Sequence, residues 1–172
     1  MRTGLTVVAV AIAALWITPS WAAASTGTLS GSCRLTGRLS FDRPVGNEPR
    51  TVAFHDVASG TCTGTLNGVP VRDAPVQNRA TGSGTLSCLG GTATTHDRLS
   101  FGHGVRIRLS TAIAGGLAEF AGRFTGRVSG EGVVQVNLLP YLDQSVLAAC
   151  QAGALREARY DLVARTVSPV IG

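Results

Sequence analysis

Residues 104–129 read GVRIRLSTAIAGGLAEFAGRFTGRVS, and apolar residues alternate with polar ones along both halves of this stretch. Strict alternation is the pattern of a half-buried β-strand, because successive side chains of a strand point to opposite faces of the sheet. Gly115-Gly116 lies between the two halves and predicts a two-residue hairpin turn. The stretch therefore predicts an antiparallel hairpin with one apolar face and one polar face.

A turn at Gly115-Gly116 sets the register of this hairpin and places Arg108 directly across from Arg123. The face expected to be buried carries Val105, Ile107, Leu109, Ile113, Phe120, Phe124 and Val128. The opposite face is polar and carries four arginines, namely Arg106, Arg108, Arg123 and Arg127. This face is either an ordinary solvated surface or a binding site for an anionic partner, such as a polysaccharide or a phosphate-bearing polymer.

The rest of the chain after residue 24 shows the same short alternating segments separated by turn residues. Asn67-Gly68 predicts a second tight hairpin turn. Longer loops are predicted at 42–49 and 73–77, and a helix is predicted only at 141–154. The predicted strands cover residues 28–41, 50–57, 60–66, 69–72, 80–89, 92–96, 104–114, 117–129, 132–139 and 157–167. The expected fold class is all-β: a single antiparallel β-barrel or β-sandwich domain of about 8–10 strands.

Residues 1–24 have the three parts of a secretory signal peptide. Arg2 supplies the positive charge, 5–17 is an uncharged apolar run, and Ala22-Ala23-Ala24 offers the small residues of a cleavage site. The run is shorter than the about 20 apolar residues of a membrane-spanning helix. We therefore expect cleavage after Ala24, no transmembrane segment in the mature chain, and a secreted, extracellular domain formed by residues 25–172.

Four cysteines, Cys33, Cys62, Cys88 and Cys150, lie in the exported part. An even number in an oxidising compartment indicates two disulfides, for which three pairings exist. If the strands on either side of the 42–49 loop pair about a centre near residues 47 and 48, Cys33 faces Cys62, and Cys88 is left to pair with Cys150. A register slip would give a different pairing. No C-x-x-C occurs, so we expect no zinc site.

Three histidines are the candidates for acid–base chemistry that the sequence places near carboxylates. His55-Asp56 and His96-Asp97 are doublets, and His103 lies nearby. Adjacent residues of a strand point to opposite faces, so the doublets indicate surface or strand-end residues rather than catalytic pairs, with Asp97 at a strand end. A secreted hydrolase using His55, His96 or His103 is the alternative.

The excess of arginine is modest and points to no particular partner. The chain of 172 residues has 15 basic and 10 acidic residues, giving a net charge of +5, and every basic residue is arginine. A small positive charge of this kind favours solubility and weak attraction to anionic surfaces. The sequence contains no G-x-S-x-G, Walker or G-x-G-x-x-G motif and no specific nucleic-acid motif. We therefore assign no catalytic residue, no metal and no cofactor.

Short cysteine-containing strings link the chain to a known group of proteins. GSC at 31–33, GTCTG at 60–64, LSC at 86–88 and the late Cys150 resemble small secreted four-cysteine all-β proteins of high-GC Gram-positive bacteria, which have no assigned activity. The resemblance covers most of the mature chain. It implies export, disulfides and an all-β fold, and it transfers no catalytic residue.

Two kinds of binding function remain open at this point. The first is a non-enzymatic extracellular binding or envelope-associated module whose partner is unknown or is an anionic polymer. The second is a lipocalin-like carrier of a small apolar ligand, because small inward-facing residues can leave a cavity inside a barrel. An internal cavity with apolar walls favours the carrier.

Overall fold

The computed structural model describes residues 27–116, 119–126 and 130–171. Strands make up most of this part, with two short 3₁₀ turns and one α-helix. In chain order the elements are β1 (Thr28–Val45), β2 (Arg50–Leu66), β3 (Val69–Ser87), β4 (Gly90–Phe101), η1 (Gly102–Gly104), β5 (Arg106–Gly116), β6 (Glu119–Gly126), β7 (Glu131–Asn137), η2 (Leu139–Tyr141), α1 (Gln144–Gln151), β8 (Leu155–Thr166) and β9 (Val170–Ile171). The predicted signal peptide, Met1 to Ala24, lies outside the described residues.

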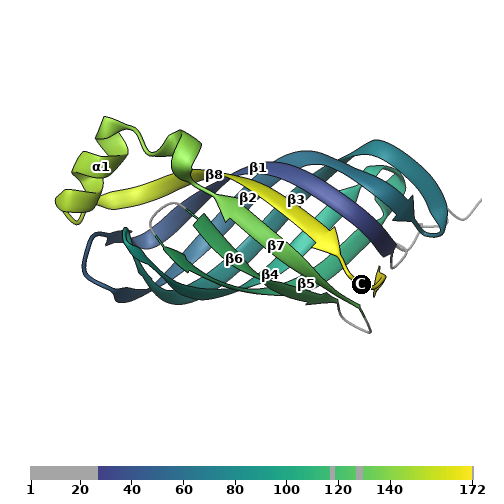
Figure 1. Ribbon diagram of the computed structural model, residues 1–172, viewed down its shortest axis with the longest axis horizontal. Helices are drawn as coiled ribbons and strands as arrows, with labels where there is room; N and C mark the ends of the chain where they lie inside the picture. Colours follow the sequence, from purple (N-terminus) through teal and green to yellow (C-terminus); the bar gives the residue numbers. More distant parts are fainter. Residues whose placement is uncertain (1–26, 117–118, 127–129, 172) are drawn as a thin grey trace, which may run out of the picture.

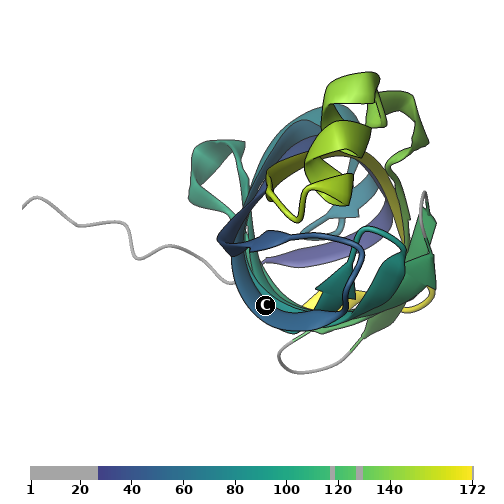
Figure 2. The same cartoon turned by 90° about the vertical axis from the view of Figure 1, so that its left-hand side faces the viewer.

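The strands close into an antiparallel barrel of eight strands, which decides between the two predicted all-β architectures. Each strand from β1 to β8 pairs with the next one along the chain, and β1 also pairs with β8. Figure 2, a view from the α1 end, shows the resulting ring. Among the described residues each strand from β1 to β8 has a partner strand on both sides, which removes the exposed edges of an open sheet, and the short strand β9 pairs only with β1.

The register predicted for the β1–β2 ladder and both predicted disulfides are confirmed. Cys33 lies directly opposite Cys62, and the two are bonded with their Cα atoms 4.0 Å apart. Cys88 and Cys150 form the second disulfide. The Asn67-Gly68 turn is also confirmed, because both residues have positive φ angles of 53° and 75°, as a type I′ turn requires.

The register predicted for the 104–129 hairpin is wrong, although its faces are right. Gly115 and Gly116 are not the turn: they belong to β5 and pair with Phe120 and Glu119. Arg123 therefore lies opposite Ala112 rather than Arg108. The centre of the pairing moves by two residues toward the C-terminus, so each residue faces a partner four positions later than predicted. Because four is an even number, each side chain keeps its predicted face. Ile107, Phe120 and Phe124 are buried, whereas Arg106, Arg108 and Arg123 are exposed; Arg127 and Val128 lie outside the described residues.

Two other local predictions are wrong because the strands β3 and β4 are longer than predicted. The predicted loop at 73–77 lies within β3, which continues from Val69 to Ser87. Asp73 adopts a positive φ of 51° beside a register shift in the β2–β3 ladder, so a bulge replaces the loop. Asp97, predicted at a strand end, lies well inside β4.

Inward-facing glycines make room for aromatic rings inside the barrel. Tyr160 lies directly opposite Gly37, and a Cβ atom on Gly37 would come within 2.3 Å of the tyrosine ring. Phe54 covers Gly82 in the same way on the β2–β3 pair. An aromatic ring lying flat over a cross-strand glycine is a recognised way of stabilising a strongly bent sheet.

The two ends of the barrel are covered by different segments (Figure 1). At one end lies α1, whose first turn is capped by Asp143 accepting a hydrogen bond from the Val146 amide. The Cys88–Cys150 disulfide ties this helix to the β3–β4 turn. At the other end β9 pairs with the start of β1 and buries Val170. The predicted helix at 141–154 is thus confirmed in shorter form.

Candidate functional site

A cavity of about 160 Å³ lies inside the barrel. All eight barrel strands contribute to its wall, and α1 contributes Val146 and Cys150 at one end. Most of the wall is apolar; it includes Leu35, Leu39, Phe54, Leu109, Ile113, Phe120, Phe124, Val134, Val136, Ala158 and Leu162. A cavity of about 150 Å³ with such walls stays dry and accepts benzene in another protein. The lumen therefore has the size and surface to hold a small apolar molecule.

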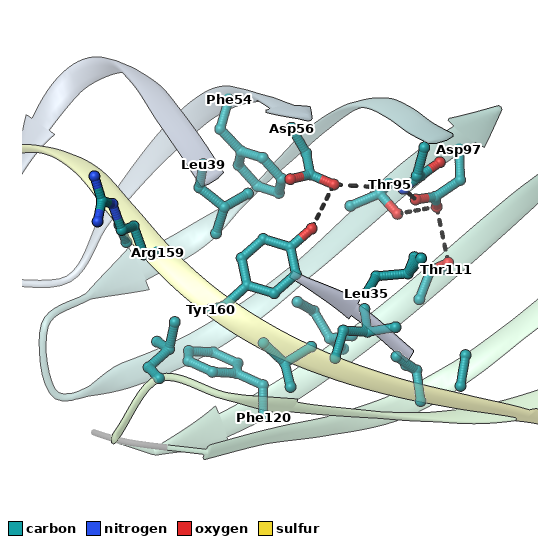
Figure 3. Close-up of a pocket in the computed structure, with 18 of the residues that line it drawn as sticks. Leu35, Leu39, Phe54, Asp56, Thr95, Asp97, Thr111, Phe120, Arg159 and Tyr160 are labelled. Carbon is teal, nitrogen blue, oxygen red and sulfur yellow. Dashed lines mark hydrogen bonds between the residues drawn. The ribbon is translucent and has the colours of Figure 1, made fainter. Parts of the chain in front are cut away.

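One polar cluster interrupts the apolar wall, and Asp97 is its best-satisfied member (Figure 3). The hydroxyls of Thr95 and Thr111 both donate to Asp97 Oδ2. Asn78 Nδ2 donates to Asp97 Oδ1 over 2.9 Å. Both carboxylate oxygens of Asp97 thus accept hydrogen bonds from protein donors.

Asp56 is the second carboxylate of the cluster, and it is more deeply buried and less well satisfied. Its Oδ2 accepts a hydrogen bond of 2.7 Å from the Tyr160 hydroxyl and a longer one, 3.4 Å, from Asn78 Nδ2. Its Oδ1 is buried and has no partner among the described residues, and the same is true of Asn78 Oδ1. A buried polar atom without a partner costs about 1–3 kcal/mol. Two such atoms in one cluster make this part of the interior energetically costly.

Burial and a neighbouring negative charge act together on Asp56. Burial, which penalises the charged form, raises the pKa of its carboxyl from 3.8 to about 6, and the charge of Asp97 adds to this increase. The hydrogen bonds from Tyr160 and Asn78 lower the pKa in part. The pKa of Tyr160 is raised by its own burial and by Asp56, so its hydroxyl remains a proton donor.

The sequence carries a signal for this cluster in the alternation of β2 and β3, which the His-Asp doublets do not show. Asp56 follows Val52 and Phe54 in strict alternation and so belongs to the buried phase of β2. Asn78 shares the buried phase of β3 with Val76 and Ala80. Ala80 lies directly between Asp56 and Asp97 in the two ladders, and its small side chain leaves space for Asn78 to reach both carboxylates.

The candidate histidines do not form a site with these carboxylates. His55 and His96 are exposed on the outer face, on strands separated by β3, with Thr81 between them in the ladder. His96 Nδ1 is 3.2 Å from Ser110 Oγ. Asp56 and Asp97 point into the lumen, so the sheet separates each histidine from its neighbour in sequence, as predicted. His103 lies in η1, and its side chain is not described.

The outer face also carries an arrangement of arginines that the sequence did not predict. Arg79, Arg98 and Arg108 lie in direct register on the adjacent strands β3, β4 and β5. All three are exposed, and none forms an ion pair with a described residue, whereas Arg123 lies 3.7 Å from Glu131. Together with His55 and His96 they line a surface hollow of about 680 Å³. We call Arg79, Arg98 and Arg108 the arginine row.

Among residues 27–116, 119–126 and 130–171, no group of three or more histidine, cysteine, aspartate or glutamate side chains is placed to hold a metal ion. In the same ranges no helix has both the length and the apolar character needed to cross a membrane. Comparison with protein-family models, curated proteins and solved structures finds no match to the chain. The chemistry of the lumen and of the outer face therefore carries the functional argument.

Proposed function

We propose that the protein is a secreted, non-enzymatic binding protein that carries a small, mainly apolar ligand in the lumen of its barrel. The apolar cavity of about 160 Å³ carries this proposal. The two disulfides support an extracellular location, because such bonds persist in oxidising compartments. The resemblance to small secreted proteins of Gram-positive bacteria agrees with this location.

The size of the cavity sets the size of the ligand. A volume close to that of the benzene-binding cavity favours a single ring or a short branched chain over a fatty acid or a sterol. Ala158 on β8 lines the lumen, and its side chain is small enough that a larger residue there would occupy the same space as the ligand.

We expect wild-type protein to bind toluene and the Ala158→Leu variant to bind it at least tenfold more weakly. Isothermal titration of buffer saturated to graded levels with toluene measures both affinities. The matched control is Ala112→Leu, which adds the same atoms on the exposed outer face of β5 and should bind like wild type. Equal affinity in all three proteins, or no binding by folded wild type, would contradict the proposal.

The arginine row supports a second candidate function, binding of an anionic polymer by the outer face. Like charges directly opposite each other in a sheet destabilise it, and here three cations are adjacent without an acidic partner among the described residues. An anionic polymer lying across β3, β4 and β5 would remove this repulsion. The predicted face of Arg106, Arg108, Arg123 and Arg127 is thereby revised, because Arg108 belongs to the row and Arg123 is paired with Glu131.

We expect the double variant Arg98→Ser/Arg108→Ser to elute from heparin at clearly lower salt than wild type, with no loss of thermal stability. The control Arg123→Ser removes one exposed arginine that already has an acidic partner and should elute close to wild type. If each variant shifts elution only in proportion to the charge removed, the row is no more than part of a solvated basic surface.

A further inference from the structure

The polar cluster of the lumen has more acceptors than donors. Its donors are the hydroxyls of Thr95, Thr111 and Tyr160 and the amide group of Asn78, and every one of them already donates to a carboxylate. The atoms left without a partner, Asp56 Oδ1 and Asn78 Oδ1, are both acceptors. The cluster therefore lacks a hydrogen-bond donor. An ammonium group has three donors, whereas an alcohol has one and an ether has none.

The cluster also has a surplus of negative charge. Asp56 and Asp97 are bridged by the single amide of Asn78, and among the described residues the wall contains one cationic side chain, Arg159. Arg159 is exposed, and Figure 3 shows its guanidinium directed away from the two carboxylates. Buried charges are normally paired, so the described residues leave the position of a cation open.

The surroundings of the cluster set the rest of the ligand. Asp56 and Asn78 are only 6% and 4% exposed, and the wall beyond them consists of aliphatic and aromatic side chains such as Leu35, Leu39 and Phe120 (Figure 3). A bare metal ion would leave this apolar space unfilled, and a purely apolar ligand would leave the two carboxylates in the wall without a counter-charge. A molecule with both parts satisfies both surfaces.

We propose that the ligand of the lumen is a small primary amine, whose ammonium group pairs with the Asp56 carboxylate in the wall and whose apolar body fills the cavity. Asp97 supplies the second negative charge without direct contact being required. This inference rests on the proposed carrier function and names the ligand class for the same cavity. When the amine leaves, the buried Asp56 carboxylate again lacks a counter-charge.

The test compares three probes of nearly the same size, benzylamine, benzyl alcohol and toluene, by isothermal titration at pH 7.5. We expect wild type to bind benzylamine at least tenfold more tightly than either neutral probe. Asp56→Asn should lose this preference and keep its affinity for toluene. The control Asp73→Asn removes an exposed carboxylate of β3 at a positive φ that asparagine tolerates, and it should bind all three probes like wild type.

A second measurement on wild-type protein keeps the test independent of the variants. The ¹³C shift of the Asp56 carboxyl reports its titration, and benzylamine should lower the Asp56 pKa, whereas toluene should not. The other titratable groups that face Asp56 are Asp97 on β4 and Tyr160 on β8, and both are present in every sample. Equal affinity for benzylamine and toluene would overturn the amine proposal and leave the carrier function intact. No binding of any probe would overturn both.

Discussion

Replacing Cys88 and Cys150 together by serine is expected to lower the free energy of unfolding by about 4 kcal/mol. The disulfide joins residues separated by 62 positions, and in the chain-entropy model the stabilisation grows with the length of the closed loop. The bond also holds α1 against the β3–β4 turn, and Cys150 and Val146 both line the lumen. Urea unfolding of the oxidised wild type and the double variant measures the loss.

The same variant should exchange ligand faster, because α1 covers one end of the barrel (Figure 1). The control is Cys33→Ser/Cys62→Ser, which opens a shorter loop of 29 positions between strands that remain paired along their length. That variant should lose somewhat less stability and leave the dissociation rate of toluene unchanged. Equal dissociation rates in both variants and in wild type would show that ligand does not leave past α1.

Asp56→Asn is expected to stabilise the protein at neutral pH and to have little effect in acid. The folded pKa of Asp56, about 6, is higher than its ordinary value of 3.8, so between these values the folded protein binds more protons than the unfolded chain. Stability from this group is greatest below pH 4 and falls as the pH rises through 6. A shift of about two pKa units corresponds to at most about 3 kcal/mol at pH 7.5.

Urea unfolding of wild type and Asp56→Asn at pH 4 and pH 7.5 tests this sign, because other groups contribute equally to both proteins. Asp143→Asn provides a contrast: hydrogen bonds from Ser145 and the Val146 amide lower the pKa of Asp143, so its carboxylate stabilises above its ordinary pKa and this contribution is lost as the pH falls. An Asp56→Asn effect that is the same at both pH values would show that the buried carboxylate has no excess cost in the folded protein.

A carboxylate that costs stability is the expected mark of a ligand site rather than of a structural core. Asp97 is fully satisfied by protein donors, and a cluster selected only for packing would satisfy Asp56 in the same way. Instead Asp56 Oδ1 has no hydrogen-bond partner among the described residues. The amine proposal explains this difference between two neighbouring aspartates.

The fold could be predicted from local patterns because the alternation of a strand and the residues of a turn can be recognised from neighbouring positions in the sequence. The Asn67-Gly68 turn and the pairing of Cys33 with Cys62 are confirmed. The turn predicted at Gly115-Gly116 is wrong because these glycines belong to β5. Gly115 allows β6 to approach closely, since a Cβ atom on it would lie 2.5 Å from the Phe120 Cα. Glycine needed for a close approach between strands looks the same in sequence as glycine needed for a turn.

The candidate site was harder to predict because it depends on contacts between distant strands. Asp56 and Tyr160 are 104 residues apart in the chain, and only barrel closure through the β1–β8 pairing brings their strands to the same interior. The alternation of β2 does place Asp56 on the buried face of that strand. Which polar residues share a phase with it on other strands depends on registers that the sequence does not fix.

The most direct test of the central claim is a nuclear Overhauser experiment on methyl-labelled protein saturated with toluene. We expect contacts from the toluene ring protons to the methyl groups of Leu39, Ile113 and Val136, which line the lumen, and none to Val57 or Val133, which are exposed. Contacts confined to Val57 and Val133, or none at all from folded protein at saturation, would contradict the claim that the barrel carries its ligand inside.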